Sequence, residues 1–203
     1  MNYKLSKVLL SFLLVCVSHM SLASTFVEGK DYKKVSGLPE VTKPVVREFF
    51  SYNCPHCYQA EPTVDKMVKL LKGKIAFKRT PVGAGRPSWI LSQEAYYVAQ
   101  KLKITKQVHS KIFHYIHEEA GPFTNAQQLK AFFEFQGVSG KEFDKVYNSK
   151  DKKTTLDNYG IQLELSGITG VPTLLVNGVY VVNPGEHSAQ DLAKLVQFLV
   201  AKK

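Results

Sequence analysis

The chain has 203 residues, of which 44% are hydrophobic and 22% charged, and its formal net charge is +10. This length suits one domain with a hydrophobic core, or one domain with a large insertion. A basic chain raises the question of nucleic acid or anionic membranes, but the lysines are scattered and their longest clusters are only pairs (Lys33-Lys34, Lys152-Lys153 and Lys202-Lys203). The charge therefore indicates a solvated surface, and we expect no nucleic-acid partner.

The N-terminus has the features of a secretory signal. A basic start and a ten-residue apolar run, Val8 to Val17, are followed by small residues that end at Ala23. This order predicts export and cleavage after Ala23, because the run is about half of the ~20 residues that a membrane-spanning helix needs. An uncleaved anchor or a buried helix is the alternative. Cleavage would remove Cys16 and leave a mature chain of residues 24–203.

Strand and helix patterns alternate through the first part of this mature chain. Residues 26–35 suggest a short first strand, and the β-branched and aromatic run at 45–50 predicts a buried central strand. Pro55 suits the first turn of a helix, where its missing N–H is not needed. Apolar residues continue at helical spacing behind it, and Pro62 should kink this helix. Residues 75–80 form the next predicted strand.

From residue 88 to about 167 the sequence has no convincing strand pattern. Glycine and proline separate five predicted helices instead, at 88–103, 105–119, 125–136, 139–148 and 151–166. Strand pattern returns at 171–182, where Asn177-Gly178 predicts a hairpin with a type I′ turn, and a helix at about 188–201 follows. The order predicts an α/β fold, in which helices cover both faces of a small mixed sheet and an all-helical insertion spans about 88–167.

After signal removal, two cysteines would remain, both in the tetrapeptide Cys54-Pro-His-Cys57. They could form a metal clip, a structural staple or a redox disulfide. A four-residue closed loop removes little chain entropy, and a zinc site needs four ligands where Cys54, His56 and Cys57 supply three at most. In an exported and oxidising setting, the redox use is favoured.

The predicted helix gives the two thiols different surroundings. Cys54 lies at the helix start, where unpaired N–H groups and the macrodipole favour negative charge and lower the pKa of a thiol. His56 adds a donor and, when protonated, a positive charge. Cys57 lies one turn on and shares the core-facing side of the helix. The pattern predicts Cys54 as the nucleophile and Cys57 as the buried, resolving thiol.

Glu48 and Pro172 are both unusual residues for their predicted strands. Glu48 is a carboxylate in an apolar run, and burying it unpaired would be costly. It either accepts the proton of Cys57 or lies at a sheet surface, paired to a lysine such as Lys78. Pro172 opens a central strand, where proline is out of place. A cis Val171–Pro172 bond would expose the Val171 backbone for strand-like pairing with a bound peptide.

The segments EFFSYNCPHCY (48–58) and TGVPTLLVNGVY (169–180) closely resemble the DsbA family of bacterial periplasmic thiol oxidases, within the thioredoxin superfamily. The likeness extends over nearly the whole mature chain, including the helical insertion, and the Cys-Pro-His-Cys tetrapeptide is its specific part. The resemblance implies a thioredoxin fold with a large all-helical insertion. It also implies a periplasmic dithiol oxidase that donates its disulfide to newly exported proteins.

By this resemblance, Cys54 is the attacking cysteine that forms mixed disulfides, Cys57 resolves them, and Pro55-His56 tune the pair. Glu48 matches a buried glutamate near the second cysteine, and Lys78 stands where its lysine partner would be. The resemblance therefore favours a catalytic use of Glu48.

The resemblance also implies how this protein meets its partners. Pro172 would be the cis-proline, and Val171 and Pro172 would bind the substrate chain. Substrates would be unfolded or folding exported proteins with reduced cysteines, and a DsbB-type quinone-linked membrane oxidase would restore the disulfide. No cofactor is implied, and we expect a monomer.

Three rival functions stay open on the sequence alone. They are a disulfide reductase or isomerase on the same fold, a metal-binding module using Cys54, His56 and Cys57, and a peptide-binding chaperone with an incidental disulfide. Other candidate residues have plainer expected roles: surface or satisfied core histidines (His109, His114, His117) and aromatic core of the insertion, some of it lining a groove (Trp89, Phe132, Phe133, Phe135).

Overall fold

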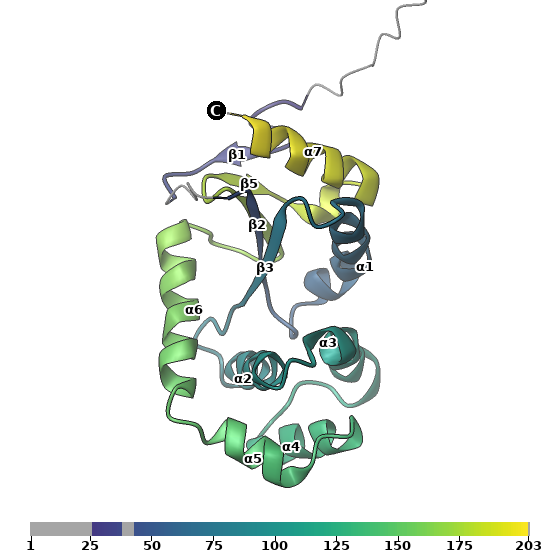
Figure 1. The fold of residues 1–203 in the computed structure, drawn as a ribbon, viewed down its shortest axis with the longest axis vertical. Coiled ribbons are helices and arrows are strands. Elements are labelled where there is room, and N and C mark those ends of the chain that lie inside the picture. Colours follow the sequence, from purple (N-terminus) through teal and green to yellow (C-terminus); the bar gives the residue numbers. More distant parts are fainter. Residues whose placement is uncertain (1–25, 38–42, 203) are drawn as a thin grey trace, which may run out of the picture.

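The computed structural model describes residues 26–37 and 43–202 of the chain (Figure 1). The predicted signal segment, its cleavage site and Cys16 lie outside the described residues. Within the two described ranges, no helix is long and apolar enough to cross a membrane.

A five-stranded mixed sheet forms the centre of the fold, with strand order β1-β5-β4-β2-β3. The strands are β1 (Lys33–Lys34), β2 (Val45–Phe50), β3 (Ala76–Pro81), β4 (Thr173–Val176) and β5 (Tyr180–Val182). β2 runs parallel to β3, whereas β4 is antiparallel to both of its neighbours. The central strand predicted at 45–50 is confirmed. The first strand is only two residues long, and both of its lysines are exposed.

Helices cover both faces of the sheet (Figure 1). They are α1 (Pro55–Leu70), α7 (Ala189–Ala201) and, on the opposite side, α6 (Lys152–Ser166). Val46 packs with Leu195 in the cluster under α1 and α7, whereas Phe49 packs with Leu163 in the cluster under α6. Because successive strand residues point to opposite faces, Glu48 lies on the same face as Val46, towards α1.

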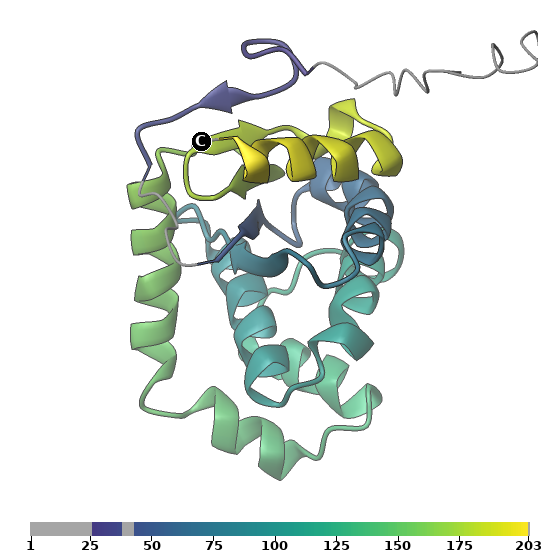
Figure 2. The ribbon, with the colours of Figure 1, turned by 45° about the horizontal axis from the view of Figure 1, so that its top comes forward.

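Most of the helical insertion lies beyond one end of the sheet, and its last helix, α6, runs back along a face of the sheet (Figures 1 and 2). It contains α2 (Pro87–Lys101), α3 (Thr105–His114), the π-helix η1 (Tyr115–Glu119), α4 (Ala126–Phe135), α5 (Gly140–Tyr147) and α6. The five predicted helices are present, but the one at 105–119 changes from α to π at Tyr115. The aromatic core of the insertion includes Phe113 and Phe133 and continues into Tyr52 and Cys57. The insertion therefore forms one wall around the cysteine pair.

The hairpin between β4 and β5 follows from two residues that tolerate left-handed backbone. Asn177 and Gly178 have φ values of 49° and 76°, and the Val179 N–H donates to the Val176 carbonyl oxygen at 3.1 Å. A type I′ turn requires positive φ at both central residues, so the predicted turn is confirmed. After it come the short 3₁₀ helix η2 (Pro184–Glu186) and α7.

Candidate active site

The Cys-Pro-His-Cys tetrapeptide joins the end of β2 to the start of α1. Cys54 directly precedes the helix with an extended backbone (φ −91°, ψ 115°), and Pro55 takes the first helical position. A residue before proline avoids the helical region, and proline at this position forfeits no hydrogen bond. Cys54 is 6% exposed and Cys57 is 1% exposed, and both are free thiols. His56, between them, is exposed.

The two thiols differ strongly in acidity. The pKa of Cys54 is lowered to about 6, first by a hydrogen bond from the Cys57 thiol and then by the backbone N–H groups of Cys57 and His56 and the charge of His56. Burial first, and the hydrogen bond with Cys54 second, raise the pKa of Cys57. At neutral pH, Cys54 is therefore mainly a thiolate and Cys57 a thiol. This is the difference that the helix position predicts.

The loop before β4 lies against the Cys54 thiol. The Val171–Pro172 peptide bond is cis, and Cys54 Sγ lies 3.6 Å from the Val171 carbonyl oxygen, to which the thiol can donate. Two hollows meet at this loop, and Gly170 and Val171 line both of them. One is a groove of about 670 Å³ on the side of His56. The other is a pocket of about 290 Å³ whose wall includes Cys54 itself.

Glu48 is buried within β2, and its partner is Arg79. The Arg79 Nε donates to Glu48 Oε2 at 2.6 Å, and Glu48 is only 1% exposed. Burial raises the pKa of Glu48, while the Arg79 charge opposes that shift. The negative charge of Glu48 is also among the influences that raise the pKa of Cys57. The carboxylate and the second cysteine are therefore electrostatically coupled.

The predicted pairing of Glu48 with Lys78 is wrong. In the β2–β3 register Glu48 lies opposite Arg79, whereas Lys78 lies opposite Arg47. Neighbouring residues of a strand point to opposite faces, so Lys78 points away from Glu48, and it is exposed. The structure leaves Lys78 outside the site. It brings together the remaining predicted residues, Glu48, Cys54, Pro55, His56, Cys57, Val171 and Pro172.

Three further buried polar groups, to which the sequence analysis gave no place in the site, lie next to the ion pair: Glu61, His109 and Tyr52. Arg79 also donates to Glu61 Oε1 at 2.8 Å, and that oxygen lies 3.2 Å from His109 Nε2. The hydroxyl of Tyr52 lies 2.6 Å from His109 Nδ1. Burial raises the pKa of Glu61 to about 7 and lowers that of His109 to about 3. The sequence could have indicated Glu61 as a neighbour of Cys57, because it lies four residues after Cys57 and therefore on the same helix face.

Each of the three histidines of the insertion contacts neighbouring side chains of the protein. His109 is buried, as expected of a core histidine, and its Nδ1 is hydrogen-bonded to Tyr52, whereas its Nε2 has no hydrogen-bond partner within the described ranges. His114 is exposed and lies 3.3 Å from the carboxylate of Glu119. His117 stacks on the ring of Tyr58, with the ring centres 4.8 Å apart. Within residues 26–37 and 43–202, no three His, Cys, Asp or Glu side chains are grouped so that they could hold a metal ion.

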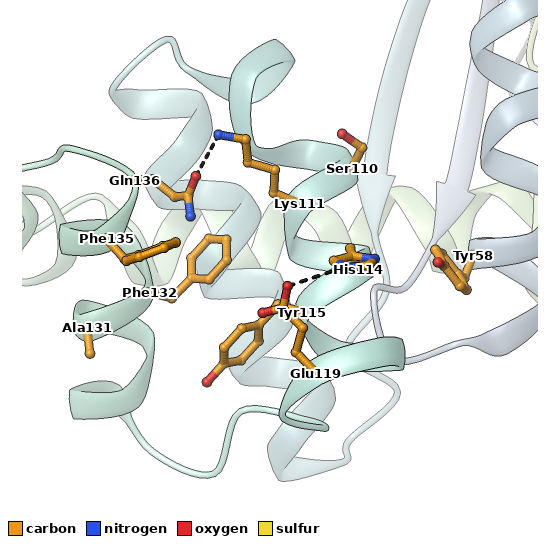
Figure 3. Close-up of a pocket in the computed structure, with 10 residues that line it drawn as sticks. All are labelled: Tyr58, Ser110, Lys111, His114, Tyr115, Glu119, Ala131, Phe132, Phe135 and Gln136. Atoms are coloured by element: carbon orange, nitrogen blue, oxygen red, sulfur yellow. Dashed lines mark hydrogen bonds and ion pairs between the residues drawn. The ribbon is translucent and has the colours of Figure 1, made fainter.

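An apolar groove of about 790 Å³ lies on the insertion between α3–η1 and α4 (Figure 3). Phe132 and Phe135 line it from α4, and Tyr58 of α1 stands at its other side. Phe135 is 88% exposed, so it is not a core residue, but it lines the groove, as predicted for some of these aromatic residues. Phe132 and Phe133 are buried as predicted. α4 turns those two side chains inwards and leaves Phe135 on its outer side.

Comparison with known proteins places this arrangement in a known class. Residues 33–198 match the family described as Thioredoxin. The solved structure of Pseudomonas aeruginosa DsbA has a TM-score of 0.78 and 28% identity, over 87% of this chain and 94% of that chain. A variant of Proteus mirabilis DsbA, solved with a non-covalently bound peptide PWATCDS, has a TM-score of 0.77 and 26% identity, over 88% of this chain and 100% of that chain. The class is that of thioredoxin-fold thiol:disulfide oxidoreductases.

Curated relatives identify the family within this class. The thiol:disulfide interchange protein DsbA of Burkholderia cepacia is 33% identical over an alignment of 205 positions, which covers 98% of this chain and 96% of the relative. The protein of the same name from Pseudomonas aeruginosa strain UCBPP-PA14 is 29% identical over an alignment of 185 positions, which covers 89% of this chain and 87% of the relative. The chain belongs to the DsbA family and is a thiol:disulfide interchange oxidase. These matches do not favour the metal-binding or chaperone alternatives.

Proposed function

We propose that this oxidase transfers the Cys54–Cys57 disulfide to exported proteins that carry reduced cysteines. A substrate thiolate attacks Cys54 Sγ, the bond between the two cysteines breaks, and Cys57 leaves as a thiolate that takes up a proton. A second substrate thiolate then attacks the substrate sulfur of the mixed disulfide and releases the Cys54 thiolate. The substrate has lost two electrons and gained a disulfide, and the protein is left in its dithiol form.

The observation that carries this proposal is the low pKa of Cys54, about 6, beside the raised pKa of Cys57. A stabilised thiolate is a good leaving group, so a mixed disulfide at Cys54 passes readily to a second thiol. The same stabilisation favours the reduced protein and therefore makes its disulfide oxidising. DsbA proteins are themselves the standard example of an active-site cysteine with a strongly lowered pKa.

Glu48 takes and returns the proton of Cys57 in this proposal. Its carboxylate is buried, its pKa is raised by that burial, and its charge acts on Cys57. Arg79 keeps the carboxylate paired when it is ionised, which limits the cost of a buried charge. Arg79 therefore supplies the positive partner that the sequence analysis expected from Lys78.

The backbone of Val171 is the proposed docking edge for the substrate chain, with Pro172 shaping its loop. Three observations support this assignment. The Val171 carbonyl lies 3.6 Å from Cys54 Sγ, a groove runs beside the loop past His56, and the similar Proteus mirabilis protein was solved with a bound peptide. Extended peptides commonly bind an exposed strand edge through main-chain hydrogen bonds.

Export to the periplasm and reoxidation by a DsbB-type quinone-linked membrane oxidase complete the proposal. The signal-like N-terminal sequence and the family membership support it. The two sulfur atoms carry both electrons, so the proposed reaction requires no prosthetic group. We expect the protein to act as a monomer.

Equilibration with a glutathione redox buffer separates an oxidase from a thioredoxin-like reductase. We expect the cysteine pair to stay mostly reduced in a buffer poised at about −200 mV, where a thioredoxin-like pair at about −270 mV would be mostly oxidised. A mostly oxidised pair in that buffer would support the reductase instead. The Cys54→Ser, Cys57→Ser double variant is the control, because an incidental disulfide predicts undiminished activity without either thiol.

A further inference from the structure

The smaller hollow beside Cys54 has the lining of a recognition pocket. Its apolar surface comes from Val82, Leu163 and Ile168, and Trp89 lines it as well. Cys54 and Val171 complete it on the side of the proposed substrate edge. At about 290 Å³ it lies at the lower end of the volumes of small-molecule sites. It can therefore take one large side chain but no folded element.

A positive charge without an acidic partner also lines this pocket. Arg86 is exposed, and its guanidinium carbon lies 4.9 Å from the centre of the Trp89 ring. No carboxylate of residues 26–37 or 43–202 forms an ion pair with it. A guanidinium stacked on an aromatic ring keeps its N–H groups free to bind a carboxylate. The charge is thus available to a ligand.

Any polypeptide whose cysteine reaches Cys54 Sγ passes this pocket, because Cys54 is part of its wall. An extended chain advances about 3.3 Å per residue, and its side chains alternate between two sides. A substrate lying along Val171 therefore brings a side chain within two positions of its own cysteine to the pocket.

We propose that this pocket is a substrate subsite, which binds an apolar side chain accompanied by a carboxylate within two residues of the reacting cysteine. The apolar side chain fills the space between Trp89 and Leu163, and the carboxylate pairs with Arg86. This inference rests on the proposed oxidation of polypeptides and names the substrate class that the site prefers.

Trp89 provides a direct reporter, since it is the only tryptophan of the chain. The emission of the protein therefore reports a change at the pocket when tryptophan-free peptides are added. Competition between peptides for this signal measures binding separately from chemistry.

The test uses two-cysteine peptides that differ only at positions within two residues of one cysteine. The guest pairs are Phe with Glu, Phe with Lys, and Ala with Gln, and the oxidised protein is the oxidant. Peptide disulfide formation is followed by chromatography. Each rate is divided by the rate at which the same protein oxidises dithiothreitol, which removes differences in intrinsic reactivity between protein variants. We expect the normalised oxidation rate of the peptide with Phe and Glu to exceed that of the peptide with Phe and Lys by about two- to five-fold, the effect of an exposed ion pair. The rate of the peptide with Phe and Glu should exceed that of the peptide with Ala and Gln by about tenfold.

The Arg86→Glu variant should reverse the order of the Glu and Lys peptides. Lys150→Glu makes the same change in net charge at an exposed lysine between α5 and α6, and it should keep the wild-type order. Equal relative rates for all guests in the wild type would overturn the subsite while leaving the oxidase in place, and so would equal effects of the two variants. A protein that oxidises none of the peptides would instead overturn the proposed function.

Discussion

At the scale of single residues, Cys54 and Cys57 lie three positions apart and yet titrate in opposite directions. Cys54 receives hydrogen bonds from the Cys57 thiol and from two backbone N–H groups. Cys57 lies deeper and is hydrogen-bonded to a thiolate, which favours its protonated form. The thiolate is the reactive form of cysteine. The position of each thiol on one turn of helix therefore supports our proposal that Cys54 is the sulfur that reacts with the substrate.

Reduced protein should be alkylated at Cys54 before Cys57, with a rate that rises through a midpoint at about pH 6. Only the thiolate reacts, so the raised pKa and the burial of Cys57 slow the alkylation of that thiol. Iodoacetamide labelling followed by peptide mapping measures the order, and its pH profile measures the midpoint. Earlier modification of Cys57 would reverse the assigned roles.

Arg79 and Lys78 should differ sharply when either is replaced by glutamine. Arg79→Gln leaves Glu48 and Glu61 buried without their cation, and loss of one partner of a buried ion pair costs about 3–5 kcal/mol. Lys78 is exposed, so Lys78→Gln should change the free energy of unfolding by less than about 0.5 kcal/mol. Urea titration of both variants checks this. Similar losses in the two would refute the assigned pairing.

Replacing Glu48 by glutamine should slow the step in which Cys57 closes the disulfide. The amide cannot accept the Cys57 proton, and a positioned base contributes at least about 100-fold to such a step. Stopped-flow reoxidation by glutathione disulfide separates the first attack by Cys54 from the closure by Cys57. The alkylation midpoint of Cys54 is the internal control and should hardly move. Equal closure rates for both proteins between about pH 5 and 8 would return Glu48 to a purely structural role.

At the scale of elements, two glycines should respond oppositely to alanine. Gly178 has a φ of 76° in the hairpin turn, where a side chain costs roughly 1–2 kcal/mol. Gly160 lies in α6 with no atom near the place of a Cβ, where alanine gains about 0.5–1 kcal/mol. The melting temperature should therefore be lower for Gly178→Ala and higher for Gly160→Ala than for the unchanged protein. Equal shifts would mean that the turn tolerates an ordinary residue.

The elements predicted best are those with strong local signals. Strand β2 stands as predicted, because its β-branched and aromatic run is bounded on both sides, and the hairpin follows from Asn177-Gly178. The start of α1 follows from Pro55. No local sequence signal marks the change to a π-helix at Tyr115, because the spacing of apolar residues is nearly the same in α3 and in η1. Exposure of Phe135 likewise depends on how α4 packs.

The partner of Glu48 could not be identified from the sequence for a related reason. Lys78 and Arg79 are adjacent cations, and the choice between them depends on the register of two parallel strands. A shift of one residue exchanges the faces of a strand, and no local signal fixes that shift between β2 and β3. His109 and Tyr52 meet through tertiary packing alone, 57 positions apart in the chain.

At the scale of the whole molecule, the sheet and the insertion together enclose a site that stabilises the reduced protein. The pKa of Cys54 is about 6 in the folded chain, against about 8.5 for a thiol in an unfolded chain. Because the folded value is the lower one, the stabilisation is complete above about pH 8.5 and is lost as the pH falls through about 6. Its full size is about 3 kcal/mol. The disulfide closes a loop of four residues and stabilises the oxidised protein by about 2 kcal/mol at any pH.

The free energy of unfolding of both redox forms, measured at about pH 5.5 and about pH 8.5, tests this thiolate stabilisation most directly. At the lower pH we predict that the oxidised form is the more stable by about 2 kcal/mol. At the higher pH the thiolate outweighs the disulfide, and the reduced form should be the more stable by about 1 kcal/mol. Groups that titrate alike in both forms cancel from the comparison. A difference between the two forms that stays constant with pH would contradict the acidic Cys54 thiolate and, with it, the oxidase mechanism.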